Sequence, residues 1–588
     1  MKDKKILFIL IPVVILSLVL LMVIIPKKSV AVTSNKKQSL KVTVKSKKEE
    51  NIKLKISNKN SKDNYDIILN NNNLNANSNV VYILKDNNKI IDKGLLFSKQ
   101  KNILTTINLD KGQEKNLDLT IIYESNKQKE KLNIDGDIEL VKHQDIEKAV
   151  LLTGSEFNKK IKDLANPNGL EGQYGEDYNI YGIKIADSKK EGIEVSDYTS
   201  PEKIYAWYEN NYIYLYSDKE IAMNRMSSSM FAKLTELTDI NDLAKLDTSN
   251  VNMMNFMFQE DTNLSNITAL AKWNTENVTE MEYMFQQCRN ITDITPLTGF
   301  NTKNLKSISY AFAGTRIDDI TALKYFNTKN LTDMSFAFEN TRISDLSPLE
   351  NWDVSKVETL VYTFAVTKIT NLDALSKWDV SSVKNLNATF NGNLYLTDIK
   401  GISNWNTKSL EKCSRMLAKT RIENLDALAK WDTSKLKEIK GLVSCSRKIT
   451  NIDGISNWDV SRVEDFESIF ELTSFTNTEA LKNWDTKNVK SMKYAFSHTK
   501  IMDAKGISNW DVSNVTNFKE AFNNTKLNDL KAISKWNTEN AETMEGMFAN
   551  SANLKDATAI DNWNVSKVDN FDGIFEKTNT KLPKWYNE

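Results

Sequence analysis

The chain has 588 residues, of which 40% are hydrophobic and 26% are charged, a composition typical of folded protein spread over several domains. Its net charge of +1 argues against a nucleic-acid-binding protein, which usually presents a concentrated basic face. Three cysteines without a CxxC pair and two histidines are too few for a disulfide framework, a His-based triad or a His-rich metal site. We therefore expect no metal, no cofactor and no nucleic-acid partner.

The N-terminus predicts contact with a membrane. An apolar segment at residues 6–25 follows Lys2, Lys4 and Lys5. A helix of this length spans about 30 Å, the thickness of a bilayer core. A cleaved secretory signal usually has a shorter apolar region, of about 7–15 residues. We expect residues 1–25 to be a retained transmembrane signal anchor, with cleavage near "SVA" at 29–31 and secretion as the alternative.

Residues 26–37 are predicted to be a linker, and residues 38–142 to form a β-sandwich. Segments such as "LKVTVKS" and "IKLKISN" alternate apolar and polar side chains and are separated by turn residues. Seven or eight such short segments in about 100 residues are typical of an antiparallel, immunoglobulin-like sandwich. Its simplest role is that of a spacer.

Residues 143–225 are predicted to be an α+β connector that caps the region after it. "DIEKAVLLTGSEFNKKIKDLA" has the apolar spacing of a helix, and "EKIYAWYENNYIYLYS" indicates a hairpin that turns at "ENN". The aromatic side chains of this hairpin could form a sugar-binding platform. Their alternation favours the packed face of a cap, which the first coil of a solenoid needs.

Residues 226–582 carry a repeat of 26 or 27 residues, for example "ENWDVSKVETLVYTF" at 350–364. An aromatic residue anchors twelve of the repeats and Leu246 the first, and a second series, mostly Phe, follows twelve residues later. A blade of a β-propeller needs about 40–45 residues, whereas this period fits one coil of a solenoid. The tryptophan anchors are Trp273, Trp352, Trp378, Trp405, Trp431, Trp458, Trp484, Trp510, Trp536 and Trp563.

Within one coil, a short strand is predicted from Leu305 to Phe312. Thr315 stands for a series of small polar residues that can satisfy the backbone of the following turn. Asp353 stands for the Asp or Asn after each anchor, which can hydrogen-bond its own backbone two residues on. The anchors are therefore predicted to be core residues of an α/β solenoid with about 13 coils, and residues 583–588 to be a C-terminal tail.

The repeats resemble those of the BspA-like bacterial leucine-rich-repeat surface proteins, the branch with "W(D/N)(T/V)S" motifs. The likeness covers residues 150–580 and includes "LLTGSEFNKKI" and "MSSSMF". It implies a leucine-rich-repeat-like fold, a location on the bacterial cell surface and a binding role. "RISDLSPLENW" at 342–352 is also similar to internalin repeats. The shared residues are structural, so the resemblance transfers no ligand site.

One candidate binding surface is a stripe of aromatic residues in register, Tyr283, Tyr310, Phe336 and Tyr362. Extended solenoid sheets are common binding faces, and aromatic side chains are enriched in interfaces. The alternative is that these rings point inward beside the neighbouring Phe residues. The alternation of the strand does not decide between the two, because the flanking residues are also apolar or small.

Two non-enzymatic functions remain in view. The first is adhesion, in which a monomeric extracellular part binds a protein or glycan on a host, a matrix or a neighbouring cell. The second is a structural or envelope-assembly role with another bacterial component as partner. An enzyme is disfavoured, because acidic pairs such as Asp318 and Asp319 lie in repeated turns rather than in a unique cleft.

Overall fold

The computed structural model describes residues 28–33, 38–45, 48–59, 62–71, 79–95, 100–124, 131–142, 148–169, 175–198 and 200–586. The chain divides into two compact units, Met1–Asp145 and Ile146–Glu588. Each unit has its own hydrophobic cluster, and each is described by itself.

The first unit is built from strands that form two sheets with the orders β1-β3-β8-β5-β6 and β2-β9-β4-β7. Alternate residues of β3 and β4, such as Leu54 and Ile67, are fully buried in the shared core of this unit. The strands are β1 (Lys28–Thr33), β2 (Gln38–Lys45), β3 (Lys48–Ser57), β4 (Asp63–Asn71), β5 (Asn79–Asp86), β6 (Lys89–Leu95), β7 (Gln100–Leu109), β8 (Glu114–Glu124) and β9 (Lys131–Lys142).

The prediction of an immunoglobulin-like, antiparallel β-sandwich for residues 38–142 is corrected here. Residues 28–33, expected to be part of a linker, form β1, which pairs parallel with β3 from Lys28↔Ile52 to Thr33↔Ser57. The described residues thus form two small sheets, one of them mixed, rather than a closed sandwich. The alternation of the sequence reports which residues are buried, but it does not report the direction in which strands pair.

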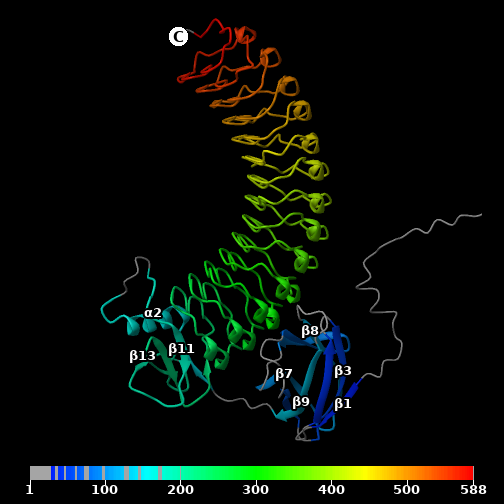
Figure 1. Cartoon of the computed structure of the whole chain (residues 1–588), viewed down its shortest axis with the longest axis vertical. Helices are drawn as coiled ribbons and strands as arrows, with labels where there is room; N and C mark the ends of the chain where they lie inside the picture. The colour runs from blue at the N-terminus through cyan, green and yellow to red at the C-terminus, as the bar shows by residue number, and fades with distance from the viewer. Residues whose placement is uncertain are drawn as a thin grey trace, which may run out of the picture. The chain divides into compact units, whose positions relative to one another are not determined.

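The second unit begins with a small α+β segment, cyan in Figure 1. Helix α2 (Gly154–Ala165) buries Phe157 and Ile161, and the predicted hairpin is present, with Asn210 and Asn211 in the left-handed region as its turn. The strands are β10 (Ala149–Val150), β11 (Gly182–Ile185), β12 (Ile193–Glu194), β13 (Tyr205–Glu209), β14 (Tyr212–Tyr216) and β15 (Ile221–Ala222), in two sheets ordered β11-β14-β13-β12 and β10-β15.

Residues 226–586, here called the repeat array, form successive coils stacked side by side (Figure 1). Single residues one repeat apart form isolated parallel bridges, such as Ser307↔Asp333. We number the coils from these bridge residues, so that coils one to thirteen begin at residues 253, 280, 307, 333, 359, 385, 412, 438, 465, 491, 517, 543 and 570.

Coils one to twelve each contain a short 3-10 helix, and a further one, η1, precedes coil one; these helices lie in file along one edge of the array (Figure 1). Their bounds are η1 (Asn241–Lys245), η2 (Thr268–Lys272), η3 (Thr295–Gly299), η4 (Thr321–Tyr325), η5 (Ser347–Leu349), η6 (Asp373–Leu375), η7 (Lys400–Ile402), η8 (Asp426–Leu428), η9 (Asp453–Ile455), η10 (Glu479–Leu481), η11 (Lys505–Ile507), η12 (Lys531–Ile533) and η13 (Thr558–Ile560).

The predicted α/β solenoid class is wrong, because residues 226–586 contain neither an α-helix nor an extended strand. The expected strand from Leu305 to Phe312 is interrupted by Tyr310, whose φ of +56° lies in the left-handed region, and a second such residue, Gly314, follows it. Left-handed residues bend an extended chain. What remains in each coil is one or two isolated bridge residues and a series of hydrogen bonds between coils, such as Tyr310 N to Ser335 O at 2.9 Å.

The aromatic anchors lie in the core of the array. All ten predicted tryptophan anchors are buried, and their indole N–H groups donate to a carbonyl of the preceding coil, for example Trp378 Nε1 to Leu349 O at 3.0 Å. The phenylalanine series stacks beside them, with 5.7 Å between the ring centroids of Phe312 and Phe338. The buried indole donors of these ten anchors thus have partners, as stability requires.

The predicted roles of the small polar residues are also confirmed. Thr315 Oγ1 donates to Phe312 O at 2.7 Å, and Asp353 Oδ1 accepts from Ser355 N at 3.1 Å. The last coil is closed by Trp585, predicted to lie in a tail. Its Nε1 donates to Ile560 O of the preceding coil at 2.8 Å, as the repeat tryptophans donate to the coils before theirs.

The prediction of a single-pass membrane anchor is corrected as well. Within the ranges that the structure describes, no helix is both long and apolar enough to cross a bilayer. Helix α2 has 12 residues, which extend about 18 Å, and it carries lysines. The apolar segment at residues 6–25 lies outside the described residues, so nothing in the structure supports anchorage through it.

Candidate partner-binding surface

A continuous stack of five aromatic rings runs across coils one to five. We call it the aromatic ladder: Phe256, Tyr283, Tyr310, Phe336 and Tyr362. The ring centroids of successive rungs are 4.6, 4.4, 4.2 and 4.7 Å apart, and the ring planes are within 14° of parallel. The four residues predicted as a stripe are therefore in direct contact with one another.

Phe256 is the rung that sequence reasoning missed. It lies 27 residues before Tyr283, one repeat away, so the repeat register itself could have identified it. Its ring stacks on Tyr283 and continues the ladder into coil one.

The rungs occupy one repeat position, whose backbone is left-handed in every coil, with φ between +51° and +61°. This conformation is uncommon for a residue with a bulky side chain and costs about 1–2 kcal/mol. Hydrogen bonds between coils, such as Phe336 N to Val361 O at 2.7 Å, hold it in place. In coils six to thirteen the same position is taken by Ala388, Arg415, Gly441, Ser468, Tyr494, Glu520, Gly546 and Gly573.

The rungs are half-buried, so they are neither core residues nor free side chains. Each of the three middle rings stacks between two neighbours, and each end ring stacks on one. Stacked aromatic pairs contribute about 0.5–1.5 kcal/mol beyond the area that they bury. The ladder is therefore a rigid apolar strip that exists before any partner arrives.

The phenol groups of Tyr283 and Tyr310 are neutral at physiological pH. Burial raises the pKa of Tyr283, and the carboxylates of Glu282 and Asp333 raise it further. Burial likewise raises the pKa of Tyr310. Neutral phenols can donate as well as accept hydrogen bonds, so these rungs offer both polar and apolar contacts to a partner.

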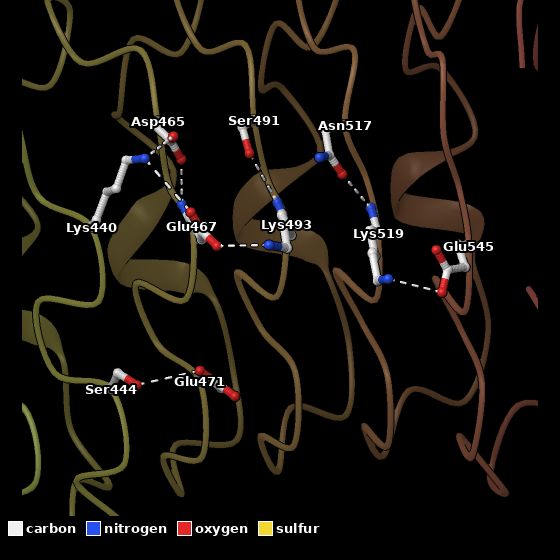
Figure 2. Close-up of polar contacts among 10 residues, drawn as sticks. All are labelled: Lys440, Ser444, Asp465, Glu467, Glu471, Ser491, Lys493, Asn517, Lys519 and Glu545. Atoms are coloured by element: carbon white, nitrogen blue, oxygen red, sulfur yellow. Dashed lines mark hydrogen bonds and ion pairs between the residues drawn. The ribbon is translucent and has the colours of Figure 1, made fainter. Parts of the chain in front are cut away.

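In the later coils, residues close in sequence to the ladder position form ion pairs from coil to coil (Figure 2). Lys440 contacts Asp465 at 2.6 Å, Lys493 contacts Glu467 at 3.0 Å, and Lys519 contacts Glu545. The hydrogen bond with Asp465 is the main cause that raises the pKa of Lys440. These charges satisfy one another across coils, which leaves less of their electrostatic potential for a partner.

Other chemistry-bearing residues do not gather into a site in the part of the chain that the structure describes. Cys288 and Cys413 are buried, and burial raises the pKa of both thiols, which makes them unreactive. No group of three or more His, Cys, Asp or Glu residues among the described ones is arranged to hold a metal ion. The aromatic ladder is thus the best-formed candidate surface.

Comparison with known proteins gives one match. A family model described as "Mycoplasma protein of unknown function, DUF285" matches the chain at residues 224–346, 332–452, 420–505, 442–551 and 490–586. The overlapping matches together span residues 224–586, more than half of the chain. No curated protein and no solved structure is significantly similar.

Proposed function

We propose that this chain, which belongs to the DUF285 family, is a non-enzymatic adhesion protein. Its repeat array would bind a protein or glycan partner. The partner would belong to a host, a matrix or a neighbouring cell. The observation that carries the proposal is the half-buried aromatic ladder, which spans five consecutive coils.

Three properties of the ladder support this role. Aromatic residues dominate the energetics of protein interfaces because they bury much area at low entropic cost. Because hydrogen bonds between coils already hold the backbone of the rungs, binding a partner costs little conformational entropy there. The strip is also restricted to coils one to five, whereas a purely structural ring stack would have no reason to end there.

The resemblance of the repeats to BspA-like surface proteins agrees with adhesion. The second candidate is a structural role in which the same array binds a component of the producing cell's own envelope. The paired charges of the later coils favour neither candidate, and the two differ only in where the partner is found. That the protein is not an enzyme stays a prediction from the sequence.

Removing the central rung is expected to weaken adhesion. The substitution Tyr310→Ser deletes the ring that contacts both Tyr283 and Phe336, while the coil already tolerates Ser at this position, as Ser468 shows. Loss of a central aromatic contact typically costs about 2 kcal/mol or more, which corresponds to an affinity about 30-fold lower. Binding of the full-length chain to an immobilised matrix from cultured host cells measures the effect.

Tyr494→Ser is the matched control. Tyr494 has the same repeat position and the same φ of +57° as the rungs, but lies in coil ten without stacked neighbours. We expect this variant to bind within twofold of the unsubstituted chain. Equal loss in both variants would remove the ladder from the binding site, and binding only to washed cells of the producer would favour the envelope role.

A further inference from the structure

A row of unpaired cations accompanies the aromatic ladder in coils two to five. Arg289, Arg316, Arg342 and Lys368 each follow the rung of their own coil by six residues. All four are exposed. They lie in consecutive coils, whose ladder rings are 4.2–4.7 Å apart, so the charges form a continuous basic row.

None of the four cations forms an ion pair with any residue that the structure describes; Arg289 only donates from Nε to Gln287 Oε1, at 3.1 Å. This contrasts with the lysines of the array's face. There, Lys384, Lys437 and Lys490 are each within 2.9 Å of a glutamate in the preceding coil. These three lysines are thus neutralised within the array, whereas the four cations of the basic row are not.

The basic row lines a hollow of about 430 Å³ on the turn edge of coils two to five. Between the cations, the hollow is lined by the amide side chains of Gln287 and Asn340. Like charges one coil apart repel each other, and walls of one sign raise the local concentration of counter-ions. A bound polyanion would relieve this repulsion.

The row has a defined end on each side. Toward the α+β segment, a second hollow shares Gln287 and Arg289 but is lined by Glu176, Glu236 and Glu260, which would repel an anion. Toward the C-terminus, the equivalent position in coil six is the exposed Leu394. The part of a ligand that lies along this hollow therefore contacts four cations.

We propose that the basic row and the amides beside it bind an acidic polysaccharide, a linear sugar polymer with sulfate or carboxylate groups. The inference deepens the proposed adhesive function and rests on it for the biological role of the surface. Arginine holds such oxyanions through paired N–H donors, and amide side chains can bond sugar hydroxyls.

Other polyanions fit the row less well. Side chains on one face of an extended acidic peptide recur about every 6.8 Å, which does not match the step from coil to coil. Single-stranded nucleic acids bind by stacking bases on aromatic faces, and the ladder rings already cover one another's faces.

The test is binding of a size-defined heparin oligosaccharide, as a sulfated probe, to the full-length chain and to the double variant Arg316→Gln, Arg342→Gln. Removal of two exposed charge contacts is expected to lower the affinity about tenfold and to flatten its salt dependence. The matched control is Arg421→Gln, Arg447→Gln, which removes two cations at the same repeat position in coils seven and eight and should leave the affinity within twofold. Desulfated heparin distinguishes recognition of sulfate from recognition of carboxylate.

Equal affinity of the unsubstituted chain and the Arg316, Arg342 variant would overturn the inference. Binding of polyglutamate or of a single-stranded oligonucleotide as tight as that of heparin would also overturn it, because the row would then not select a sugar polymer. If the arginine variant retains heparin binding while Tyr310→Ser loses matrix binding, the acidic polysaccharide is wrong and the adhesive function stands. Retained melting temperatures in all variants confirm that each is folded.

Discussion

Trp431→Ala is expected to lower the free energy of unfolding of the repeat array by about 3–5 kcal/mol, the usual cost of deleting a large buried aromatic side chain. Trp431 is 5% exposed and stacks between Trp405 and Trp458, with centroid distances of 6.1 and 6.3 Å. The substitution also leaves Ile402 O without the indole donor that it has at 3.0 Å. Denaturant unfolding of the full-length chain, followed by tryptophan fluorescence, measures the loss.

Trp431→Phe separates the ring from its N–H group. Phe occupies the same repeat position naturally in Phe300 and Phe326, so the coil accommodates this side chain. We expect a smaller loss, about 1–2 kcal/mol, from the lost hydrogen bond and the smaller area. A loss below 1 kcal/mol for Trp431→Ala would show that the stacked tryptophans do not hold the coils together.

Gly454→Ala is expected to destabilise the array by about 1–3 kcal/mol, although it adds only one methyl group. A Cβ at this position would lie 1.8 Å from Leu425 O and 2.3 Å from Leu425 C, in the backbone of the preceding coil. No side-chain rearrangement can relieve this contact, so coils seven and eight have to move apart. The midpoint of denaturant unfolding of the variant measures the effect.

The control for this prediction comes from the neighbouring coil. Ala427 occupies the equivalent position in coil seven, and Ala427→Gly should cost only about 0.5–1 kcal/mol through backbone entropy. The opposite order, with Gly454→Ala the milder change, would mean that coils seven and eight are less closely packed than described.

The core of the array was predictable because its chemistry recurs in every coil. The anchors, Thr315 and its equivalents, and Asp353 and its equivalents repeat at fixed spacing, and each spacing reports one contact. The strands were predicted wrongly because the residue at the left-handed position varies from Tyr310 to Gly441 to Glu520, which hides a shared backbone conformation. The glycines in that series were the available signal.

The closing turn and the candidate surface were harder to predict. Trp585 follows Phe575 by ten residues, whereas Trp563 follows Phe548 by fifteen, so the regular spacing failed to include it. The sequence left open whether the ladder rings point into the core or out to solvent, and the structure shows neither arrangement. The rings stack on one another, which depends on the distance between coils and not on alternation within one coil.

The most direct test of the account asks whether a partner covers the aromatic ladder. Hydroxyl-radical footprinting of the full-length chain, free and bound to immobilised host-cell matrix, measures oxidation of each tyrosine. We expect Tyr283, Tyr310 and Tyr362 to become several-fold less reactive on binding, about as expected for groups buried in an interface, while Tyr494 is unchanged. Unchanged reactivity of all three rungs in the bound chain would contradict it.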